Sequence, residues 1–167
     1  GYRNSPAQTA EAIDPDGWLH TGDVATIDQD GYVVIVDRKK ELIINAAGKN
    51  MSPTNIESAI QVECGLIGSV IAIGDLRPYV TALVCLDPEA SAGVDDAAAL
   101  AQVEAAVERA NAGLSRVEQI KRFKIVPNTW EPGGHELTPT MKLKRKPIAE
   151  KYSDLIDELY ATDDRRK

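Results

Sequence analysis

The stretch LIGSVIAIGDLRPYVTALVCL, residues 66–86, decides the fold of this 167-residue chain. Its two ends, residues 66–73 and 80–86, are apolar and rich in β-branched side chains, which favour strands. Between them, residues 74–78 contain the glycine, aspartate and proline that favour a turn. The stretch therefore predicts an antiparallel β-hairpin.

Helices are predicted on either side of this hairpin. Ser52 offers a capping hydroxyl, Pro53 suits the first helical position, and Gly65 is a stop signal. The alanine-rich residues 95–111 predict a second helix. Three apolar residues would form its buried stripe: Leu100, Val103 and Val107.

One strand and one helix are predicted to follow. Residues 123–126 predict a third strand, a helix is expected to begin at Pro147, and the polar residues 163–167 are expected to fray. The buried face of that helix would comprise Ile148, Tyr152, Leu155, Ile156 and Leu159. This order of elements, with antiparallel pairing, indicates an α+β fold in which helices cover a three-stranded sheet.

The first part of the chain reads as strands and turns. Residues 24–27 and 32–36 are strand-like, and the acidic turn between them ends in Gly31, which predicts a short antiparallel hairpin. Residues 42–44 predict a further short strand. We therefore expect strands, and no helix, in residues 1–39.

Composition places the chain among globular proteins. Apolar residues make up 43% and charged residues 27%, which fits one ordinary domain, or a small domain with a piece of another. The net charge of −7 argues against general nucleic-acid binding. Positive charge is local instead, at residues 38–40 and 142–146, which suits a small anionic ligand.

The cysteines and the first residues of the chain indicate where in the cell the protein is expected. Cys64 and Cys85 lie at the ends of apolar runs, so buried thiols are expected rather than disulfides or a metal site, and a cytoplasmic location follows. No secretory signal is evident, and no segment has the roughly 20 apolar residues that span a bilayer. A start at Gly1, without methionine, suggests a piece of a longer chain.

Residues 137–146, LTPTMKLKRK, concentrate positive charge on a loop. The prolines and threonines, with Gly133 and Gly134 just upstream, predict that loop. A lysine on a mobile loop suits a reaction that must neutralise phosphate and carboxylate charge for only one step. A basic run can also be a solvated surface, so its meaning depends on the motifs that precede it.

Three ordered motifs precede this run: TGDV at 21–24, DRKKELII at 37–44 and AGKN at 47–50. Together with the basic run, they resemble the carboxyl-terminal third of the acyl-adenylate-forming enzymes. DRKKELII and ELTPTMKLKRK are most similar to the long-chain fatty acid CoA ligases of that superfamily. The resemblance covers essentially the whole chain. It implies that residues 1–39 end a large amino-terminal adenylating domain and that residues 40–167 form a small, mobile lid domain.

The resemblance assigns nucleotide contacts to two residues. The aspartate matching Asp23 accepts both vicinal hydroxyls of the ATP ribose in the family, and two carboxylate oxygens fit two neighbouring donors. The arginine matching Arg38 contacts the ribose and phosphate region, where a planar guanidinium is suitable. Without the resemblance, Asp23 would read as a turn aspartate and Arg38 as a surface charge.

The resemblance also assigns roles to three further residues. Lys40 matches the hinge, a residue with no chemistry whose backbone torsions absorb a rotation between two catalytic states. Gly48 matches a loop that approaches the pantetheine arm of coenzyme A, and Lys49 matches a position that is often basic or polar there, which implies a role in neutralising phosphate. The family commonly has a second glycine where this chain has Ala47.

Lys142 matches the catalytic lysine of adenylation, with Lys144 as the competing assignment. The family's commonest version has glycine directly before this lysine, whereas this chain has Met141, as the long-chain ligases do. The implied role is electrostatic: one ammonium bridges a fatty carboxylate and the ATP α-phosphate while negative charge accumulates on both. No metal ligand set is expected in these residues.

The resemblance implies a parent enzyme that makes fatty acyl-CoA from a fatty acid, ATP with Mg²⁺, and coenzyme A. Its partners would be these substrates and its own amino-terminal domain; peripheral membrane association of the parent is compatible with this reading. This chain alone is expected to be inactive. Two alternatives stay open: a fatty acyl-AMP ligase that loads a carrier protein, and a non-catalytic interaction module with this fold.

Overall fold

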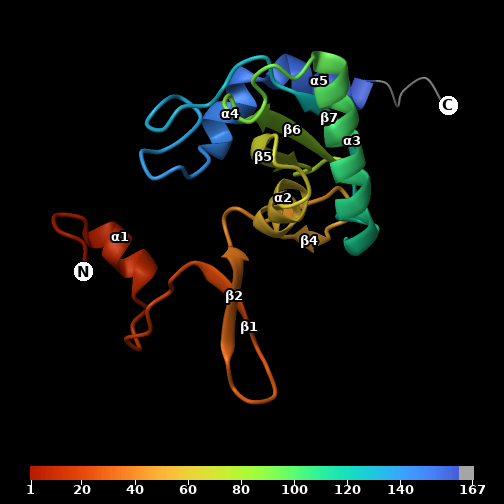
Figure 1. Ribbon diagram of the computed structural model, residues 1–167. Helices are drawn as coiled ribbons and strands as arrows, with labels where there is room; N and C mark the ends of the chain where they lie inside the picture. The colour runs from red at the N-terminus through yellow and green to blue at the C-terminus, as the bar shows by residue number, and fades with distance from the viewer. Residues whose placement is uncertain (162–167) are drawn as a thin grey trace. The chain divides into compact units, whose positions relative to one another are not determined.

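The computed structural model describes residues 1–161 and divides the chain into two compact units, Gly1–Leu42 and Ile43–Lys167. Figure 1 shows the helices and strands of each unit. The predicted fraying of residues 163–167 lies outside the described residues.

The first unit contains helix α1 (Pro6–Ala12) and a hairpin of β1 (Asp23–Ile27) and β2 (Val33–Arg38). The predicted hairpin is confirmed, with a register shift between Val24 and Ala25. The expectation that residues 1–39 contain no helix is wrong, because Pro6 takes the first position of α1. This helix buries none of its residues.

Both faces of the hairpin are apolar and exposed. Successive side chains of a strand point to opposite faces, so a run of exposed apolar residues leaves neither face covered. The exposed apolar residues of the hairpin are Ile27, Tyr32, Val33, Val34, Ile35 and Val36. A lone two-stranded hairpin is only marginally stable in water.

The second unit is organised around a sheet with the strand order β5 (Ile67–Ile73), β6 (Val80–Leu86), β7 (Ile120–Ile125). The β5–β6 pair is the predicted antiparallel hairpin. The third strand, however, pairs with β6 in parallel, so the expectation of antiparallel pairing throughout is wrong. Its cause is α3 (Asp96–Gly113), a crossover that returns the chain to the end of the sheet where β6 begins.

A second, two-stranded sheet precedes α2. It pairs β3 (Ile43–Ile44) with β4 (Asn50–Met51), and α2 (Pro53–Gln61) follows directly. The predicted start of this helix is confirmed, since the Asn55 amide donates to Ser52 Oγ at 3.1 Å.

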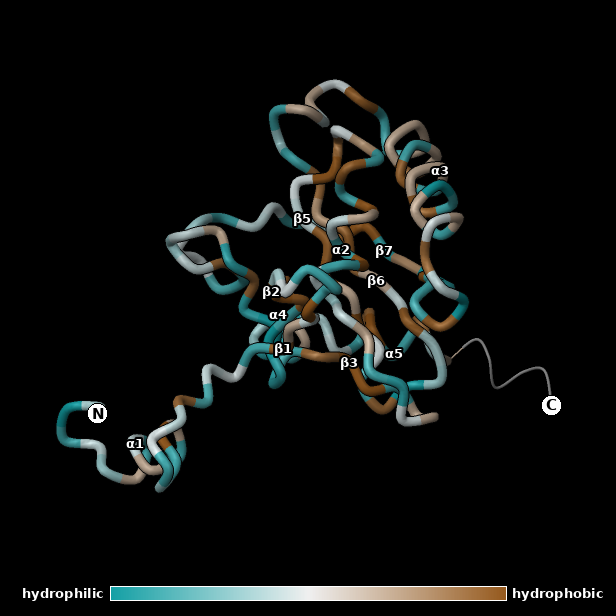
Figure 2. The backbone as a smooth tube through the Cα atoms, turned by 90° about the horizontal axis from the view of Figure 1, so that it is seen from below, coloured by the Kyte–Doolittle hydropathy of each residue, from teal (hydrophilic) through white to brown (hydrophobic). Residues whose placement is uncertain are grey.

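Helices cover both faces of the three-stranded sheet, and alternate residues of β6 face the two layers. Val80, Ala82 and Val84 belong to a core cluster with α2 and α3. Leu83 and Cys85 belong to a second cluster with α4 (Arg145–Lys151) and α5 (Ser153–Ala161). Figure 2 shows the hydrophobic segments gathered where β5, β6 and α2 meet. The α+β class, with helices over a three-stranded sheet, is confirmed.

Two details of the helices differ from expectation. Leu100 lies 43% exposed, and the buried stripe of α3 instead combines Val103 and Val107 with alanines. The helix expected to begin at Pro147 begins at Arg145 and is interrupted at Tyr152, giving α4 and α5. Of its predicted face, Leu155 is half-buried and the other four residues are buried.

Candidate functional site

A three-residue hairpin loop presents Lys142 to solvent. Leu137 and Leu143 pair as an antiparallel bridge at its base, and the Thr138 amide donates to the Lys142 carbonyl at 2.8 Å. The Lys142 amide donates to Thr138 Oγ1, and the Met141 amide to the Thr138 carbonyl, both at 3.0 Å. Thr138 thus braces the loop, which projects beside α4 (Figure 1).

Met141, the last residue of this loop, has a left-handed backbone with φ +63°. The third position of a three-residue hairpin loop commonly requires this conformation, and glycine adopts it most readily. For a residue with a Cβ the conformation costs about 1–2 kcal/mol. The turn geometry therefore favours glycine at this position, where this chain has methionine.

Glu136 and Leu137 fix the base of the loop. Leu137 is buried in the cluster beneath α4 and α5. The buried carboxylate of Glu136 forms an ion pair with Lys151 on α4, and the Glu136 carbonyl accepts from the Lys144 amide at 2.8 Å. Both apolar packing and charge therefore tie the loop to α4.

The two candidate lysines differ in what their ammonium groups do. Lys144 is half-buried, and its Nζ donates to the Gly134 carbonyl at 2.8 Å. Lys142 is exposed, and its ammonium has no hydrogen bond or ion pair with any residue in the part of the chain that the structure describes. Of the two, Lys142 is the one whose charge is open to an incoming anion.

The Glu136–Lys151 pair shifts the pKa values of both groups. Burial alone would raise the pKa of the Glu136 carboxyl, but hydrogen bonds from Lys151 and from a backbone amide outweigh burial, and the pKa is lowered. The same side-chain bond raises the pKa of Lys151, against the effect of burial. Both shifts favour the ionised pair at neutral pH.

Glu136→Gln should lower the free energy of unfolding at neutral pH, with a deficit that shrinks in acid. The wild-type carboxylate contributes stability above the ordinary glutamate pKa of about 4.3, and this contribution disappears as pH falls through the lowered folded-state pKa. Denaturant unfolding of both chains, followed through the buried Trp130, gives the two pH profiles. A deficit that stays constant down to strongly acid pH would contradict this expectation.

A second buried carboxylate positions the segment that follows the loop. Glu57 on α2 accepts two hydrogen bonds from Arg145, at 2.6 and 2.8 Å, and its Oε1 also accepts from the Ala72 amide at 2.8 Å. The Glu57 side chain is 9% exposed and that of Arg145 is 22% exposed. This bidentate ion pair joins α2 and the edge strand β5 to the first residue of α4.

Gly48 lies in the turn between β3 and β4, with φ +78°. Its amide donates to the Asn45 carbonyl at 2.8 Å. The side-chain oxygen of the buried Asn45 accepts from the amides of Ala47 and Lys49, both at 3.0 Å. The space where a Gly48 Cβ would lie is open, so within this chain it is the positive φ, not crowding, that favours glycine.

This Gly48 turn is attached to the turn between β5 and β6. The Ile44 amide donates to Asp75 Oδ1 at 3.1 Å, the Leu76 amide donates to the Ile44 carbonyl at 2.8 Å, and the Ala46 amide donates to the Arg77 carbonyl at 3.0 Å. The three-stranded sheet therefore holds the Gly48 turn in place. Lys49 is exposed beside it.

Asp23 and Arg38 lie together in the first unit. They are cross-strand partners in the β1–β2 hairpin, and Arg38 Nε lies 3.1 Å from Asp23 Oδ1. The arginine side chain is 64% exposed, so this ion pair itself adds little stability. The hairpin nevertheless brings a carboxylate acceptor and a guanidinium donor to one strand end, a pair able to meet hydroxyls and a phosphate.

Lys40 lies in the turn that follows β2. The Glu41 amide donates to the Arg38 carbonyl across this turn at 2.9 Å. Lys40 Nζ lies 3.5 Å from Glu11 Oε1, and both side chains are highly exposed. The boundary between the two compact units falls shortly after it, between Leu42 and Ile43.

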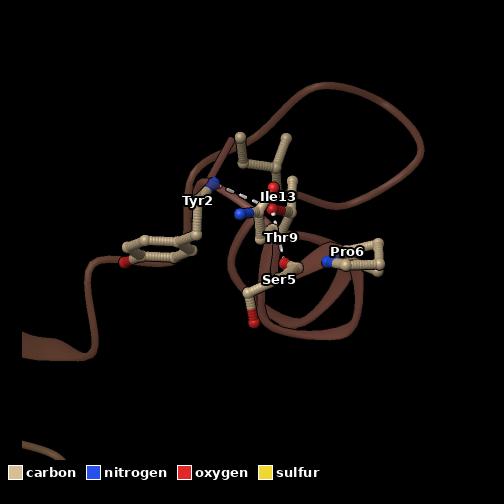
Figure 3. Close-up of a pocket in the computed structure, with 7 residues that line it drawn as sticks. Tyr2, Ser5, Pro6, Thr9 and Ile13 are labelled. Carbon is tan, nitrogen blue, oxygen red and sulfur yellow. Dashed lines mark hydrogen bonds between the residues drawn. The ribbon is translucent and has the colours of Figure 1, made fainter.

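A shallow pocket at α1 is lined by Tyr2, Ser5 and Thr9, and Figure 3 shows that the chain's own hydrogen bonds link them. Within residues 1–161, no cluster of three or more His, Cys, Asp and Glu side chains could hold a metal ion. Over the same residues, no helix has the length and apolar character to cross a membrane.

Comparison with known proteins finds one domain family and many relatives. The family described as the C-terminal domain of AMP-binding enzymes matches residues 40–164. A protein of Mycobacterium tuberculosis named as the fatty-acid–CoA ligase fadD11 is 58% identical, over 98% of this chain and 31% of that protein. The long-chain-fatty-acid–CoA ligase FadD15 of the same species is 39% identical, over 96% of this chain and 29% of that protein. The chain thus spans about a third of the length of these relatives.

Solved structures show the same fold in adenylation domains. The adenylation domain of a carboxylate reductase from Mycobacterium chelonae has a TM-score of 0.83 and 26% identity, over 96% of this chain and 26% of that one. The A domain of a carboxylic acid reductase from Segniliparus rugosus, in complex with AMP and a co-purified carboxylic acid, has a TM-score of 0.82 and 28% identity, over 97% of this chain and 26% of that one.

Proposed function

Because this chain belongs to the family of AMP-binding enzyme C-terminal domains, we propose that it is the carboxyl-terminal part of an AMP-forming long-chain fatty acid–CoA ligase. The observation that carries the proposal is the braced loop that holds the ammonium of Lys142 in solvent. Identity of 58% to fadD11 and 39% to FadD15 supports the substrate class.

In the first half-reaction, a fatty carboxylate oxygen attacks the α-phosphorus of ATP and pyrophosphate leaves, giving acyl-adenylate. Lys142 contacts the carboxylate and the α-phosphate together and stabilises the charge that accumulates between them. Asp23 accepts from the ribose hydroxyls, and Arg38 donates to the ribose and phosphate region. Mg²⁺ accompanies ATP as part of that substrate.

In the second half-reaction, the sulfur of coenzyme A attacks the acyl carbonyl carbon and AMP leaves, giving the thioester. We assign the surface around the Gly48 turn to the pantetheine arm, with Lys49 toward phosphate. Rotation about Lys40 exchanges the Lys142 loop for this surface. The sheet-bound Gly48 turn and the braced Lys142 loop suit such a rotation, because each can move as part of one rigid unit.

Residues 1–39 are proposed to end a large amino-terminal domain, and residues 40–167 to form the lid. The apolar hairpin supports this division, since its two exposed faces require a cover that the first unit does not supply. Fatty acid and the bulk of the nucleotide site would belong to the large domain, so this chain alone should not catalyse either half-reaction.

Lys40→Pro in the full-length enzyme should separate the two half-reactions. Proline fixes φ near −65°, so it should restrict the backbone rotation that the proposed hinge requires. One half-reaction should therefore stay near the wild-type rate while the other slows by about tenfold or more. ATP–pyrophosphate exchange and single-turnover thioester formation measure them separately. Lys40→Ala, which keeps the backbone free, is the control; unchanged rates of both half-reactions in the proline variant would contradict the hinge assignment.

The acceptor is tested with the full-length enzyme, a fatty acid, ATP and either coenzyme A or an acyl carrier protein. Formation of acyl-CoA, with release of AMP, supports the proposed function. Adenylation followed by transfer only to the carrier protein would instead identify a fatty acyl-AMP ligase. Absence of adenylation altogether would favour a non-catalytic module.

A further inference from the structure

Met141 combines two features that rarely occur together. Its backbone is in the left-handed region, and its apolar side chain is 58% exposed. Glycine would relieve the backbone strain at this loop position, and asparagine would tolerate it. The turn therefore does not require methionine for its own geometry.

Residues 1–161 give Met141 no place in a core cluster whose packing would offset the strain. Met141 belongs to neither core cluster, although its neighbours in the loop base, Leu137 and Leu143, both pack in the second one. Its amide serves the turn, by donating to the Thr138 carbonyl, but any residue except proline could supply that bond. Strained residues that persist without local compensation often mark functional contacts.

We propose that Met141 is a positioning residue: its thioether side chain packs against an apolar wall of the enzyme's own large domain and seats the loop that carries Lys142. This inference rests on the proposed function. The inference follows from the adjacency of Met141 and Lys142 in the chain, because adjacent Cα atoms lie about 3.8 Å apart. If Lys142 enters a closed site at the α-phosphate, Met141 must enter the domain interface beside it.

The bracing of the loop strengthens the argument. Thr138 holds both the Met141 amide and the Lys142 amide, so the two side chains cannot be placed independently. A contact made by Met141 therefore fixes the direction from which Lys142 approaches. Methionine suits such a contact because its unbranched, polarisable side chain adapts to an irregular apolar surface, whereas a β-branched residue would strain further at positive φ.

The test uses the full-length enzyme with Met141→Gly, Met141→Ala and Met141→Leu. Met141→Gly should raise the unfolding temperature, because the left-handed strain is relieved, yet lower kcat for ATP–pyrophosphate exchange by about tenfold. Met141→Ala should show a similar loss of kcat. Met141→Leu should stay within about threefold of wild type, since it restores the apolar bulk. KM for ATP should change little in all three, because the contact forms only as the loop closes.

Leu76→Gly is the matched control. Among residues 43–161, Leu76 is the other exposed large apolar residue with a left-handed backbone, at φ +55°. Its glycine variant should also gain thermal stability but keep wild-type adenylation. Wild-type kcat in Met141→Gly or Met141→Ala would overturn the inference. Lys142→Ala separates the two proposals: if it slows exchange while the Met141 variants do not, only this inference fails, and if it does not slow exchange, the proposed function fails.

Discussion

Lys142→Ala in the full-length enzyme is expected to slow acyl-adenylate formation by about 10²–10³-fold, or roughly 3–4 kcal/mol, the usual loss when one preorganised donor is removed from a charged transition state. Lys142 is exposed, and its side chain has no partner within the described residues 1–161, so its removal should leave the fold intact. The loss should appear in kcat rather than in the dissociation constant of ATP, because the ammonium acts where charge accumulates. ATP–pyrophosphate exchange measures it.

Lys146→Ala is the matched control for this prediction. Lys146 is also exposed and lies in the same basic run, and it forms an ion pair with Glu150 at 4.0 Å. Its removal tests whether adenylation depends on the total positive charge of the basic run or on the ammonium of Lys142 in particular. A Lys146→Ala enzyme as slow as Lys142→Ala would show that the basic run acts as a diffuse charge.

Glu57→Ala should destabilise the second unit by roughly 3 kcal/mol, the low end of the range for breaking a buried ion pair. The change leaves Arg145 without its bidentate partner and the buried Ala72 amide without its acceptor. The low end is expected because Arg145 is 22% exposed and can recover some hydration. Denaturant unfolding of the 167-residue chain, followed through Trp130, measures the loss.

The control for this prediction is another glutamate–arginine pair, Glu63 with Arg109, at 2.7 Å. Both of its side chains are more exposed, at 34% and 52%, so Glu63→Ala should cost less than about 1 kcal/mol. Equal losses in the two variants would show that burial does not decide the strength of these pairs. Because Arg145 begins α4 directly after the Lys142 loop, Glu57→Ala should also slow adenylation in the full-length enzyme.

Local signals account for the parts of the fold that could be predicted. The β5–β6 hairpin follows from two apolar runs and the turn between them, and the start of α2 follows from Ser52 and Pro53, which act within one helical turn. A Ser-Pro pair also begins α1, with Ser5 as the cap and Pro6 as the first helical residue, but no apolar stripe accompanies it, so local signals do not predict this helix. The direction of β7 could not be predicted from local sequence signals, because its parallel pairing with β6 depends on the path of α3.

In the candidate site too, some residues could be predicted from the sequence and others could not. Motif spacing pointed to Lys142, Gly48, Asp23 and Arg38, and their roles remain predictions. The supports of these residues were not predicted, because they join distant parts of the chain: Glu57 and Arg145 are 88 residues apart. Asn45 lies near Gly48 and could have been found, since asparagine often accepts from backbone amides in turns. The structure adds one difference between Lys142 and Lys144 that motif spacing does not give, because the ammonium of Lys144 donates to the Gly134 carbonyl.

The central claim is that one lid domain serves both half-reactions. It is tested most directly by giving the full-length Lys142→Ala enzyme preformed fatty acyl-adenylate and coenzyme A and measuring the rate at which acyl-CoA forms. The account predicts that acyl-CoA forms at close to the wild-type rate, although the same enzyme barely makes acyl-adenylate from ATP, because Lys142 has left the site before the thiol attacks. A thioester step slowed as much as adenylation would contradict the account, since one arrangement of the lid would then serve both reactions.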